Sequence, residues 1–335
     1  MSHPRLSLAL QAPDALPAVG EIAVFSPRGE TDLGDLPKDR VRVVQGFRPD
    51  HDAFAAQGYA VAPEPAGPYA AAVVFLPRSK SEARALLHEA ATRVRPGGPI
   101  WVDGAKTDGI DSVLKGLRAA GPVSDPISKA HGKVFSFAAT SGALAEWQAQ
   151  PLHPAPGFIT LPGVFSADNV DRGSMLLAAA LPAKLPGRVA DLGAGWGWLS
   201  AEVLKRDGVD ELHLIEADHA ALACARANIN DPRAHFHWAD ATQFQPEARF
   251  GAVVMNPPFH TARAADPALG AAFIRAAGGM LSLSGTLWMV ANRHLPYEAA
   301  LRAAFHEVAE VAGDGAFKVM RATKPIVGAA GRPHG

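Results

Sequence analysis

Residues 250–260 read Phe-Gly-Ala-Val-Val-Met-Asn-Pro-Pro-Phe-His, a strand pattern that ends in a rigid polar turn. In an open α/β sheet the carboxyl ends of strands carry the ligand sites, so we expect chemistry at this turn. Each proline fixes its own φ and lacks an N–H, and the residue before it favours extended backbone. Asn256, Pro257 and Pro258 therefore offer side-chain and backbone oxygens to an amino group. Phe259 offers a face on which a flat ring can stack.

A glycine-rich turn upstream is the second strong signal. The segment Val189-Ala190-Asp191-Leu192 predicts a strand end, and Gly193-Ala194-Gly195-Trp196-Gly197 leads from it into a helix. Glycines let the backbone pass close to a ligand and leave N–H groups at the helix start to face it. Such a turn alone serves a dinucleotide as well as another adenosine-containing cofactor.

The strands that follow narrow the choice of cofactor. Leu212 to Ile215 is predicted to be a strand that ends in Glu216, whose carboxylate can accept from ribose hydroxyls. A third strand around His235 to Trp238 ends at Asp240, which can accept from an adenine amino group. We expect a cofactor groove over consecutive strand ends, formed by Asp191, Gly193, Ala194, Gly195, Glu216, Ala217, Asp240, Ala241 and Asn256.

The first half of the chain shows the same alternation of short apolar runs and helical ones. Predicted strands lie at Ile22 to Phe25, Val41 to Val44, Ala71 to Leu76 and Ile100 to Val102, with a helix over Ser81 to Val94. This alternation predicts a mostly parallel sheet flanked by helices. The layout around Ala71 to Pro77 repeats that of Gly251 to Pro257 about 180 residues later, which indicates a duplicated fold. The alternative is that all such α/β units look somewhat alike.

A proline-rich stretch without periodic pattern, Gln148 to Pro162, marks a linker between the two halves. We therefore predict two domains, residues 1–150 and residues 151–335. The first has Phe75-Leu76-Pro77 where the second has Asn256-Pro257-Pro258, and no glycine loop precedes it. The first half is thus interpreted as a degenerate copy that keeps the fold without the site.

Taken together, the order of Asp191, the glycine turn, Glu216, Asp240 and Asn256-Pro257-Pro258-Phe259 resembles the class I S-adenosylmethionine-dependent methyltransferases. Further segments make the resemblance closer, to the ribosomal RNA guanine-N2 methyltransferases of the RsmC type. They are Leu161 to Ser166, Asp171-x-Gly173-Ser174, Val290-Ala291-Asn292, Leu295-Pro296-Tyr297 and Phe317 to Ala322. The resemblance implies two tandem Rossmann-like methyltransferase domains, the first of them degenerate. It also implies S-adenosyl-L-methionine as cofactor and a guanine of ribosomal RNA or the small ribosomal subunit as substrate. Gly251, where the family commonly has an acidic residue, and Glu216, where aspartate is more usual, depart from the pattern.

Composition limits the class of protein and its partners. The 335 residues are 48% hydrophobic, contain no apolar run long enough for a membrane span, and lack a basic-then-apolar signal pattern at the N-terminus. We therefore expect a soluble cytoplasmic monomer. The formal net charge of −1 requires any nucleic-acid partner to meet a local basic patch. The single cysteine, Cys224, excludes an internal disulfide and is expected to be buried in a helix. His3, His88 and His131 lack metal-ligand spacing, so no metal is predicted.

Several interpretations stay open at this point. A large-subunit ribosomal RNA, a protein glutamine amide and a DNA adenine are alternative methyl acceptors, and an RNA-binding pseudo-methyltransferase is the non-enzyme alternative. His260 is a candidate general base or substrate contact. Trp196 and Trp198 either touch the cofactor or pack the helix against the sheet. Asn292, Arg293 and Lys318 either contact RNA or have structural roles.

Overall fold

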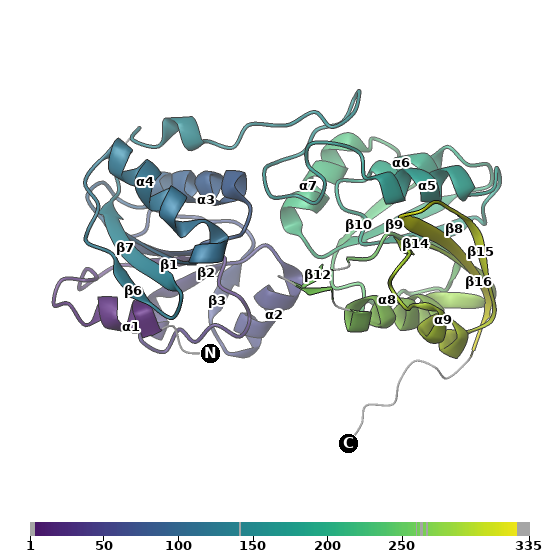
Figure 1. Ribbon diagram of the computed structural model, residues 1–335, viewed down its shortest axis with the longest axis horizontal. Coiled ribbons are helices and arrows are strands. Elements are labelled where there is room, and N and C mark those ends of the chain that lie inside the picture. Colours follow the sequence, from purple (N-terminus) through teal and green to yellow (C-terminus); the bar gives the residue numbers. More distant parts are fainter. Residues whose placement is uncertain (1–3, 141, 259, 262–263, 266, 327–335) are drawn as a thin grey trace, which may run out of the picture. The chain divides into compact units, whose positions relative to one another are not determined.

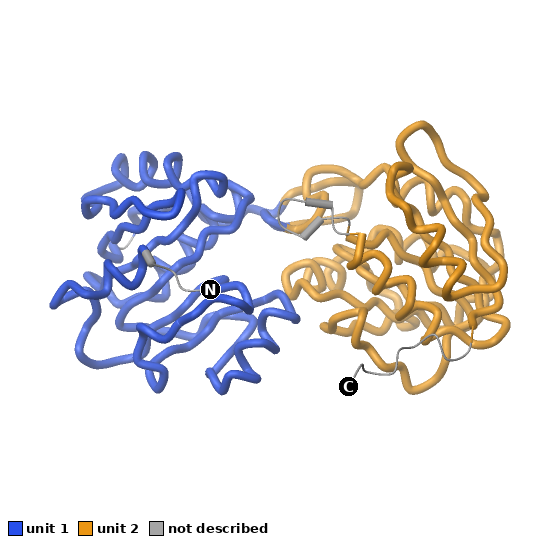
Figure 2. The backbone as a smooth tube through the Cα atoms, turned by 60° about the horizontal axis from the view of Figure 1, so that its bottom comes forward, with its two compact units in different colours: residues 1–151, 161–163 blue, residues 152–160, 164–335 orange. Residues whose placement is uncertain are grey.

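The computed structural model describes residues 4–140, 142–258, 260–261, 264–265 and 267–326. The chain divides into two compact units (Figure 2). Unit 1 contains residues 1–151 and 161–163, and unit 2 contains residues 152–160 and 164–335. No helix among the described residues combines the length and the apolar character that crossing a membrane requires.

Each unit is built on one sheet. Unit 1 contains α1 (Pro4–Leu10), β1 (Ile22–Phe25), β2 (Val41–Val44), α2 (Arg48–Ala56), β3 (Ala60–Ala62), β4 (Ala71–Phe75), α3 (Lys80–Arg93), β5 (Pro99–Ala105), α4 (Ile110–Ala120), β6 (Ile127–Lys129) and β7 (Gly132–Ala138). Unit 2 contains α5 (Arg172–Ala180), β8 (Arg188–Leu192), α6 (Trp198–Leu204), β9 (Glu211–Glu216), α7 (His219–Asn228), β10 (Ala234–Trp238), β11 (Phe250–Met255), α8 (Pro267–Met280), β14 (Leu281–Asn292), α9 (Glu298–Ala304), β15 (Phe305–Gly313) and β16 (Phe317–Pro325). A short hairpin, β12 (His260–Thr261) with β13 (Ala264–Ala265), follows β11.

The two sheets have one topology. The strand order is β3-β2-β1-β4-β5-β7-β6 in unit 1 and β10-β9-β8-β11-β14-β16-β15 in unit 2. In each sheet the first five strands pair in parallel. The sixth strand in the order, β7 or β16, is antiparallel to both of its neighbours. Position by position, β1 corresponds to β8, β2 to β9, β3 to β10 and β4 to β11. The predicted fold class, two tandem Rossmann-like domains with mostly parallel sheets, is confirmed.

Helices cover both faces of the unit 2 sheet (Figure 1). On one face, Leu177 of α5, Val203 of α6 and Ala225 of α7 pack on alternate strand residues such as Val254. On the other, α8 and α9 pack on the strand residues between them, with Ile274 against Val253, Met255 and their neighbours. Because both faces are buried, the strands are nearly continuous apolar runs, as expected for a parallel sheet.

Unit 1 has the same layers, with α3 and α4 on one face and α1 and α2 on the other. Its strand ends differ in chemistry. β4 runs into Leu76, which is buried and apolar, whereas β11 runs into Asn256. Unit 1 therefore keeps the sheet and its cores while its β4 end lacks the amide.

The predicted elements agree closely with the observed ones. β1 and β2 begin and end at the predicted residues, and β5 is longer than predicted by one residue at its start and three at its end. α3 begins one residue early because Ser79 accepts a hydrogen bond from the Glu82 N–H and caps the helix. Cys224 is buried in α7, as predicted.

Candidate functional site

Two neighbouring strands bring the glycine turn and the Asn-Pro-Pro turn together. β8 and β11 pair in parallel, with Asp191 opposite Val254 and Leu192 opposite Met255. Asn256 follows β11 directly, so it lies beside Gly193 at the same sheet edge. Parallel pairing thus places the amide at the start of the glycine turn.

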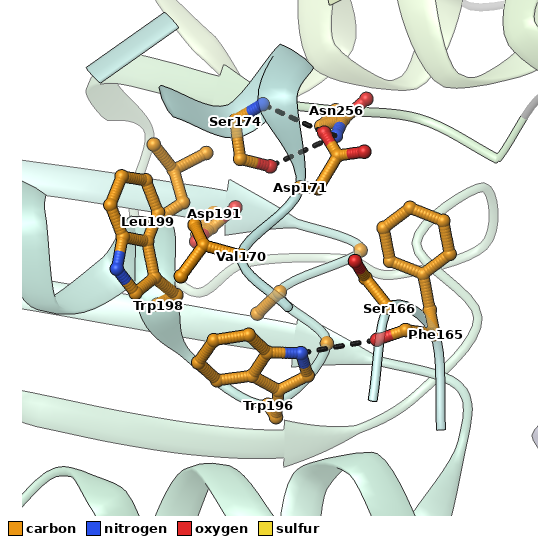
Figure 3. A pocket seen from close by; sticks show the side chains of 13 residues that line it. Phe165, Ser166, Val170, Asp171, Ser174, Asp191, Trp196, Trp198, Leu199 and Asn256 are labelled. Atoms are coloured by element: carbon orange, nitrogen blue, oxygen red, sulfur yellow. Dashed lines mark hydrogen bonds between the residues drawn. The ribbon is translucent and has the colours of Figure 1, made fainter. Parts of the chain in front are cut away.

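The Asn256 amide is held in one orientation (Figure 3). Its Nδ2 donates to Asp171 Oδ2 at 2.8 Å and to Ser174 Oγ at 2.9 Å. Both hydrogens of Nδ2 are then used, which directs Oδ1 away from these partners. Oδ1 is buried and has no hydrogen-bond partner among the described residues. An orphaned buried acceptor is costly, so the site is arranged to receive a donor.

Asp171 has a second task at the start of α5. The same Oδ2 accepts the Ser174 backbone N–H at 2.8 Å and caps the helix. The local sequence explains the geometry, because aspartate is a preferred N-cap and the N–H three residues later is the one it satisfies. The helix cap therefore also orients the amide.

Asp191 is a buried acid at the end of β8. It is 1% exposed, and its Oδ2 accepts from the Ser200 hydroxyl at 2.7 Å. Its Oδ1 is buried without a partner among the described residues. Burial raises the pKa of Asp191 to about 7. The hydrogen bond from Ser200 lowers this pKa, and the negative charge of Glu216 raises it further. A positively charged ligand would favour its ionised form.

Glu216, the last residue of β9, is bound to the glycine turn. Its Oε2 accepts the Gly195 N–H and its Oε1 accepts the Asp218 N–H, both at 2.7 Å. Burial raises the pKa of Glu216 to about 7, although these amides oppose the rise. The carboxylate and the glycine N–H were both expected to face a ligand, and in this structure they bind each other.

The glycine turn itself depends on left-handed backbone. Gly193, Gly195 and Gly197 have φ values of 74°, 56° and 89°. Residues with a Cβ rarely adopt such values, which explains the three glycines. Ala194, between the first two, is buried in the core.

The acid after β10 is engaged locally. Asp240 Oδ1 accepts from the Thr242 backbone N–H at 2.8 Å and from the Thr242 hydroxyl at 2.7 Å. Ala241 is buried, and the Ala217 carbonyl accepts the Trp238 indole N–H at 2.9 Å. These contacts hold the loops that follow β9 and β10.

A pocket, here called the strand-end pocket, lies at these strand ends (Figure 3). Its lining residues are Phe165, Ser166, Val170, Asp171, Ser174, Asp191, Gly193, Ala194, Gly195, Trp196, Trp198, Leu199 and Asn256. Of the predicted cofactor residues, Asp191, Gly193, Ala194, Gly195 and Asn256 line it. Glu216, Ala217, Asp240 and Ala241 are not among its lining residues, nor are Pro257, which is buried, and Pro258, which is exposed. Phe259 and the side chain of His260 lie outside the described residues.

Sequence reasoning assigned no role to several pocket residues. Phe165 is 61% exposed, and Asp171 and Ser174 hold the amide. The signal available for Asp171 was its N-cap pattern before an apolar helix. Its contact with Asn256, 85 residues away, follows only from the fold.

Three of the open interpretations gain structural detail. Trp196 is buried, packs edge-on against Phe158 and donates its indole N–H to the Phe165 carbonyl at 3.1 Å, so it has a packing role while it also lines the pocket. Lys318 is 3% exposed and donates to the Leu295 carbonyl and to Glu298, which is a structural role. Arg293 binds Glu310 and the Asp314 carbonyl.

Comparisons with known proteins agree with this geometry. The methyltransferase small domain model matches residues 156–321, and the methyltransferase small domain N-terminal model matches residues 43–147. The chain is 32% identical over 260 residues to the ribosomal RNA small subunit methyltransferase C of Shewanella loihica, covering 74% of this chain and 75% of the relative. The chain belongs to the ribosomal RNA small subunit methyltransferase C family. Another member, from Pseudomonas paraeruginosa, is 33% identical over 273 residues and covers 78% of this chain and 81% of its own length.

A solved structure matches nearly the whole chain. It is the T. thermophilus 16S rRNA N2 G1207 methyltransferase (RsmC), in complex with AdoMet and guanosine. The match has a TM-score of 0.78 and 26% sequence identity, and it covers 96% of this chain and 92% of the other. The methyltransferase class that the resemblance implies is thus confirmed.

Proposed function

We propose that this protein transfers a methyl group from S-adenosyl-L-methionine to the exocyclic N2 of a guanine in 16S ribosomal RNA. Family membership supports the reaction class, and the similar T. thermophilus protein is described with AdoMet and guanosine. The observation in this chain that carries the proposal is the buried, unpaired Oδ1 of Asn256 in the strand-end pocket. An acceptor fixed in this way suits an amino group.

The Asn256 amide is proposed to make the guanine amino group a better nucleophile. The lone pair of a guanine amino group is delocalised into the ring, and acceptors that hold its hydrogens make the nitrogen lone pair more available. Asn256 Oδ1 is one such acceptor, and the backbone carbonyl at Pro257 is the proposed second. Because methyl transfer is an in-line displacement, correct placement supplies much of the rate. A guanine in folded RNA must first be unstacked, at roughly a few kcal/mol.

The residues around the pocket fit the cofactor. S-adenosyl-L-methionine supplies a methyl group on a positively charged sulfonium and also carries an ammonium. Asp191 presents a buried oxygen without a partner among the described residues, next to the glycine turn. We propose that Asp191, Gly193, Ala194 and Gly195 bind the cofactor. Glu216, Ala217, Asp240 and Ala241 are proposed to complete the site from the neighbouring strand ends.

The rest of the Asn-Pro-Pro-Phe turn is proposed to support the reaction. Pro257 and Pro258 stiffen the turn, and Phe259 is proposed to stack on the target base.

Unit 1 is proposed to dock RNA or to support unit 2. We further propose that the protein works in the cytoplasm as a monomer without a metal in its catalytic step.

The test is a methylation assay with labelled S-adenosylmethionine. Purified protein is incubated separately with unmodified small subunits, large subunits and each naked ribosomal RNA. Label recovered as N2-methylguanine in small-subunit samples alone supports the proposal. Label in large-subunit RNA, or label in protein as methylglutamine, would replace it with the corresponding alternative. Comparing subunit with naked RNA gives the assembly stage of the substrate.

A further inference from the structure

Four side chains with metal-binding atoms share one face of two neighbouring strands in unit 2. Glu211 and His213 lie on β9, and His235 and His237 lie on β10. The strands pair in parallel with His213 opposite His235, and residues two apart on a strand point to the same face. β10 is the edge strand of the sheet. The pairing therefore gathers a glutamate and three imidazoles at one edge.

The distances are short. Potential ligand atoms of Glu211, His213 and His235 all lie within 4.8 Å of one another. His213 Nε2 stands 3.4 Å from Glu211 Oε2, and the rings of His213 and His235 have centroids 4.9 Å apart. Ligands of a tetrahedral zinc at about 2.0–2.1 Å stand roughly 3.4 Å from each other. Small side-chain rotations of Glu211 and the exposed His235 would bring the atoms to that spacing.

We propose that Glu211, His213 and His235 form a binding site for a borderline divalent transition metal such as Zn²⁺, separate from the strand-end pocket. Two imidazoles and a carboxylate are nitrogen and oxygen ligands of the type that zinc takes, with water in the fourth position. His213 is buried and Glu211 is half-buried, whereas His235 is exposed, so the site opens to solvent.

His237 is the positioning residue of this site. Its Nε2 lies 2.9 Å from His213 Nδ1, and the two ring planes are nearly parallel, with an interplanar angle of 5°. A ligating histidine commonly donates its second ring N–H to a neighbouring acceptor, which fixes its tautomer. If His213 Nδ1–H donates to His237, the His213 Nε2 lone pair is left to face Glu211.

Arg188 opposes the cation and limits its affinity. Its guanidinium donates to Glu211 Oε2 at 2.6 Å. A metal must share this carboxylate with a positive charge or displace it. We therefore expect affinity weaker than that of a closed structural zinc site.

Metal binding is expected to stabilise the pairing of β9 with β10. A bound ion would join the edge strand β10 to β9. Both strands lead to proposed cofactor residues, Glu216 and Asp240. At about 3.3 Å per residue, Glu216 lies about 10 Å along the strand from His213, so the ion takes no part in methyl transfer.

The experiment measures Zn²⁺ binding to the full chain, freed of metal and without a histidine tag, by calorimetry. His235→Ala removes an exposed ligand and leaves the core intact. His306→Ala, an exposed histidine on β15 at the opposite edge of the sheet, is the matched control. We expect one equivalent of Zn²⁺ per chain, at least tenfold weaker binding in His235→Ala and Glu211→Gln, and unchanged binding in His306→Ala. His237→Ala should weaken binding about tenfold while it keeps the stoichiometry.

Two further readings complete the test. Zn²⁺ should raise the melting temperature of the wild type and not that of His235→Ala. Co²⁺ in place of Zn²⁺ should give the visible absorption of a low-symmetry site. Equal Zn²⁺ binding by wild type and His235→Ala, or no binding at micromolar metal, would overturn the proposal.

Discussion

Asn256 presents an acceptor because its donors are already used. Replacing it with alanine removes Oδ1 and leaves the glycine turn and Asp191 in place. We expect Asn256→Ala to abolish methyl transfer, with S-adenosylmethionine affinity changed by less than about threefold, as for an interaction made mainly in the transition state. Labelled transfer and calorimetry measure the two quantities. A variant that keeps full activity would remove Asn256 from the catalytic step.

Asp171 is expected to act through Asn256. Asp171→Ser keeps a residue that caps α5 but is too short to hold the amide as well, so Asn256 can rotate. We expect kcat to fall by about tenfold to hundredfold, because small misplacements cost this much, with cofactor affinity unchanged.

The matched variant for this contact is Asp171→Asn, which keeps an oxygen at the Oδ2 position and should restore most of kcat. Comparable losses in both variants, with lowered melting temperatures, would indicate a purely structural role for Asp171.

Cofactor binding should depend on pH through two acids at the strand ends, Asp191 and Glu216. The pKa values of Asp191 and Glu216 are each raised to about 7. Without ligand, the folded protein keeps these two protons up to about pH 7, whereas the unfolded chain releases them near pH 4. Protonation of the two acids therefore stabilises the folded state at low pH, and the free energy of unfolding that it contributes falls as pH rises from about 4 to 7. A cationic ligand favours the ionised acids, so its affinity should rise with pH.

We expect S-adenosylmethionine affinity to rise up to about tenfold from pH 6 to pH 8 for each proton displaced. Calorimetry in buffers of different ionisation enthalpy should detect proton release on binding. Asp191→Asn should bind more weakly and with a shallower pH dependence. Affinity that is flat over this range in the wild type would contradict the assignment.

At the level of elements, α6 begins after Gly197, where both a positive φ and close neighbouring side chains disfavour a Cβ. A Cβ on Gly197, at φ 89°, would lie 2.8 Å from Ile229 Cδ1 and 3.2 Å from Ala225 Cβ. A Cβ on Gly195, at φ 56°, would meet nothing within 4 Å. An alanine at Gly195 therefore adds backbone strain alone, whereas an alanine at Gly197 adds both strain and crowding.

Gly197→Ala should lower the free energy of unfolding by about 2–4 kcal/mol, since strain and overpacking add. Gly195→Ala should cost only about 1–2 kcal/mol, from strain alone. Denaturant unfolding of both variants measures the difference. Equal losses would show that the Ile229 contact relaxes at no cost.

For the whole molecule, the two units share one sheet topology and differ in their strand ends. If unit 1 docks RNA, residues 152–335 expressed alone should bind S-adenosylmethionine like the full chain. Methylation of small subunits should fall at least roughly tenfold, because a second binding module contributes through effective concentration. Full activity of a well-behaved fragment would assign unit 1 no part in substrate binding.

The sequence by itself determined the parallel sheets, the glycine turn and the place of Asn256. These features depend on local rules: apolar runs bounded by turn residues, glycines where φ is positive, and prolines that stiffen a strand end. The duplicated fold was also predictable, since the same pattern recurs along the chain. Apart from this recurrence, each of these signals lies within a few consecutive residues.

Only the tertiary structure decided which distant side chains meet. Asp171 reaches Asn256 because α5 packs beside β14, the neighbour of β11 in the sheet. Glu216 binds Gly195 across two strand ends. The prediction that the protein binds no metal was based on the spacing of histidines along the chain. The pairing of β9 with β10 brings together Glu211, His213 and His235 from different strands. Strand register and helix packing set such contacts, and a local pattern contains neither.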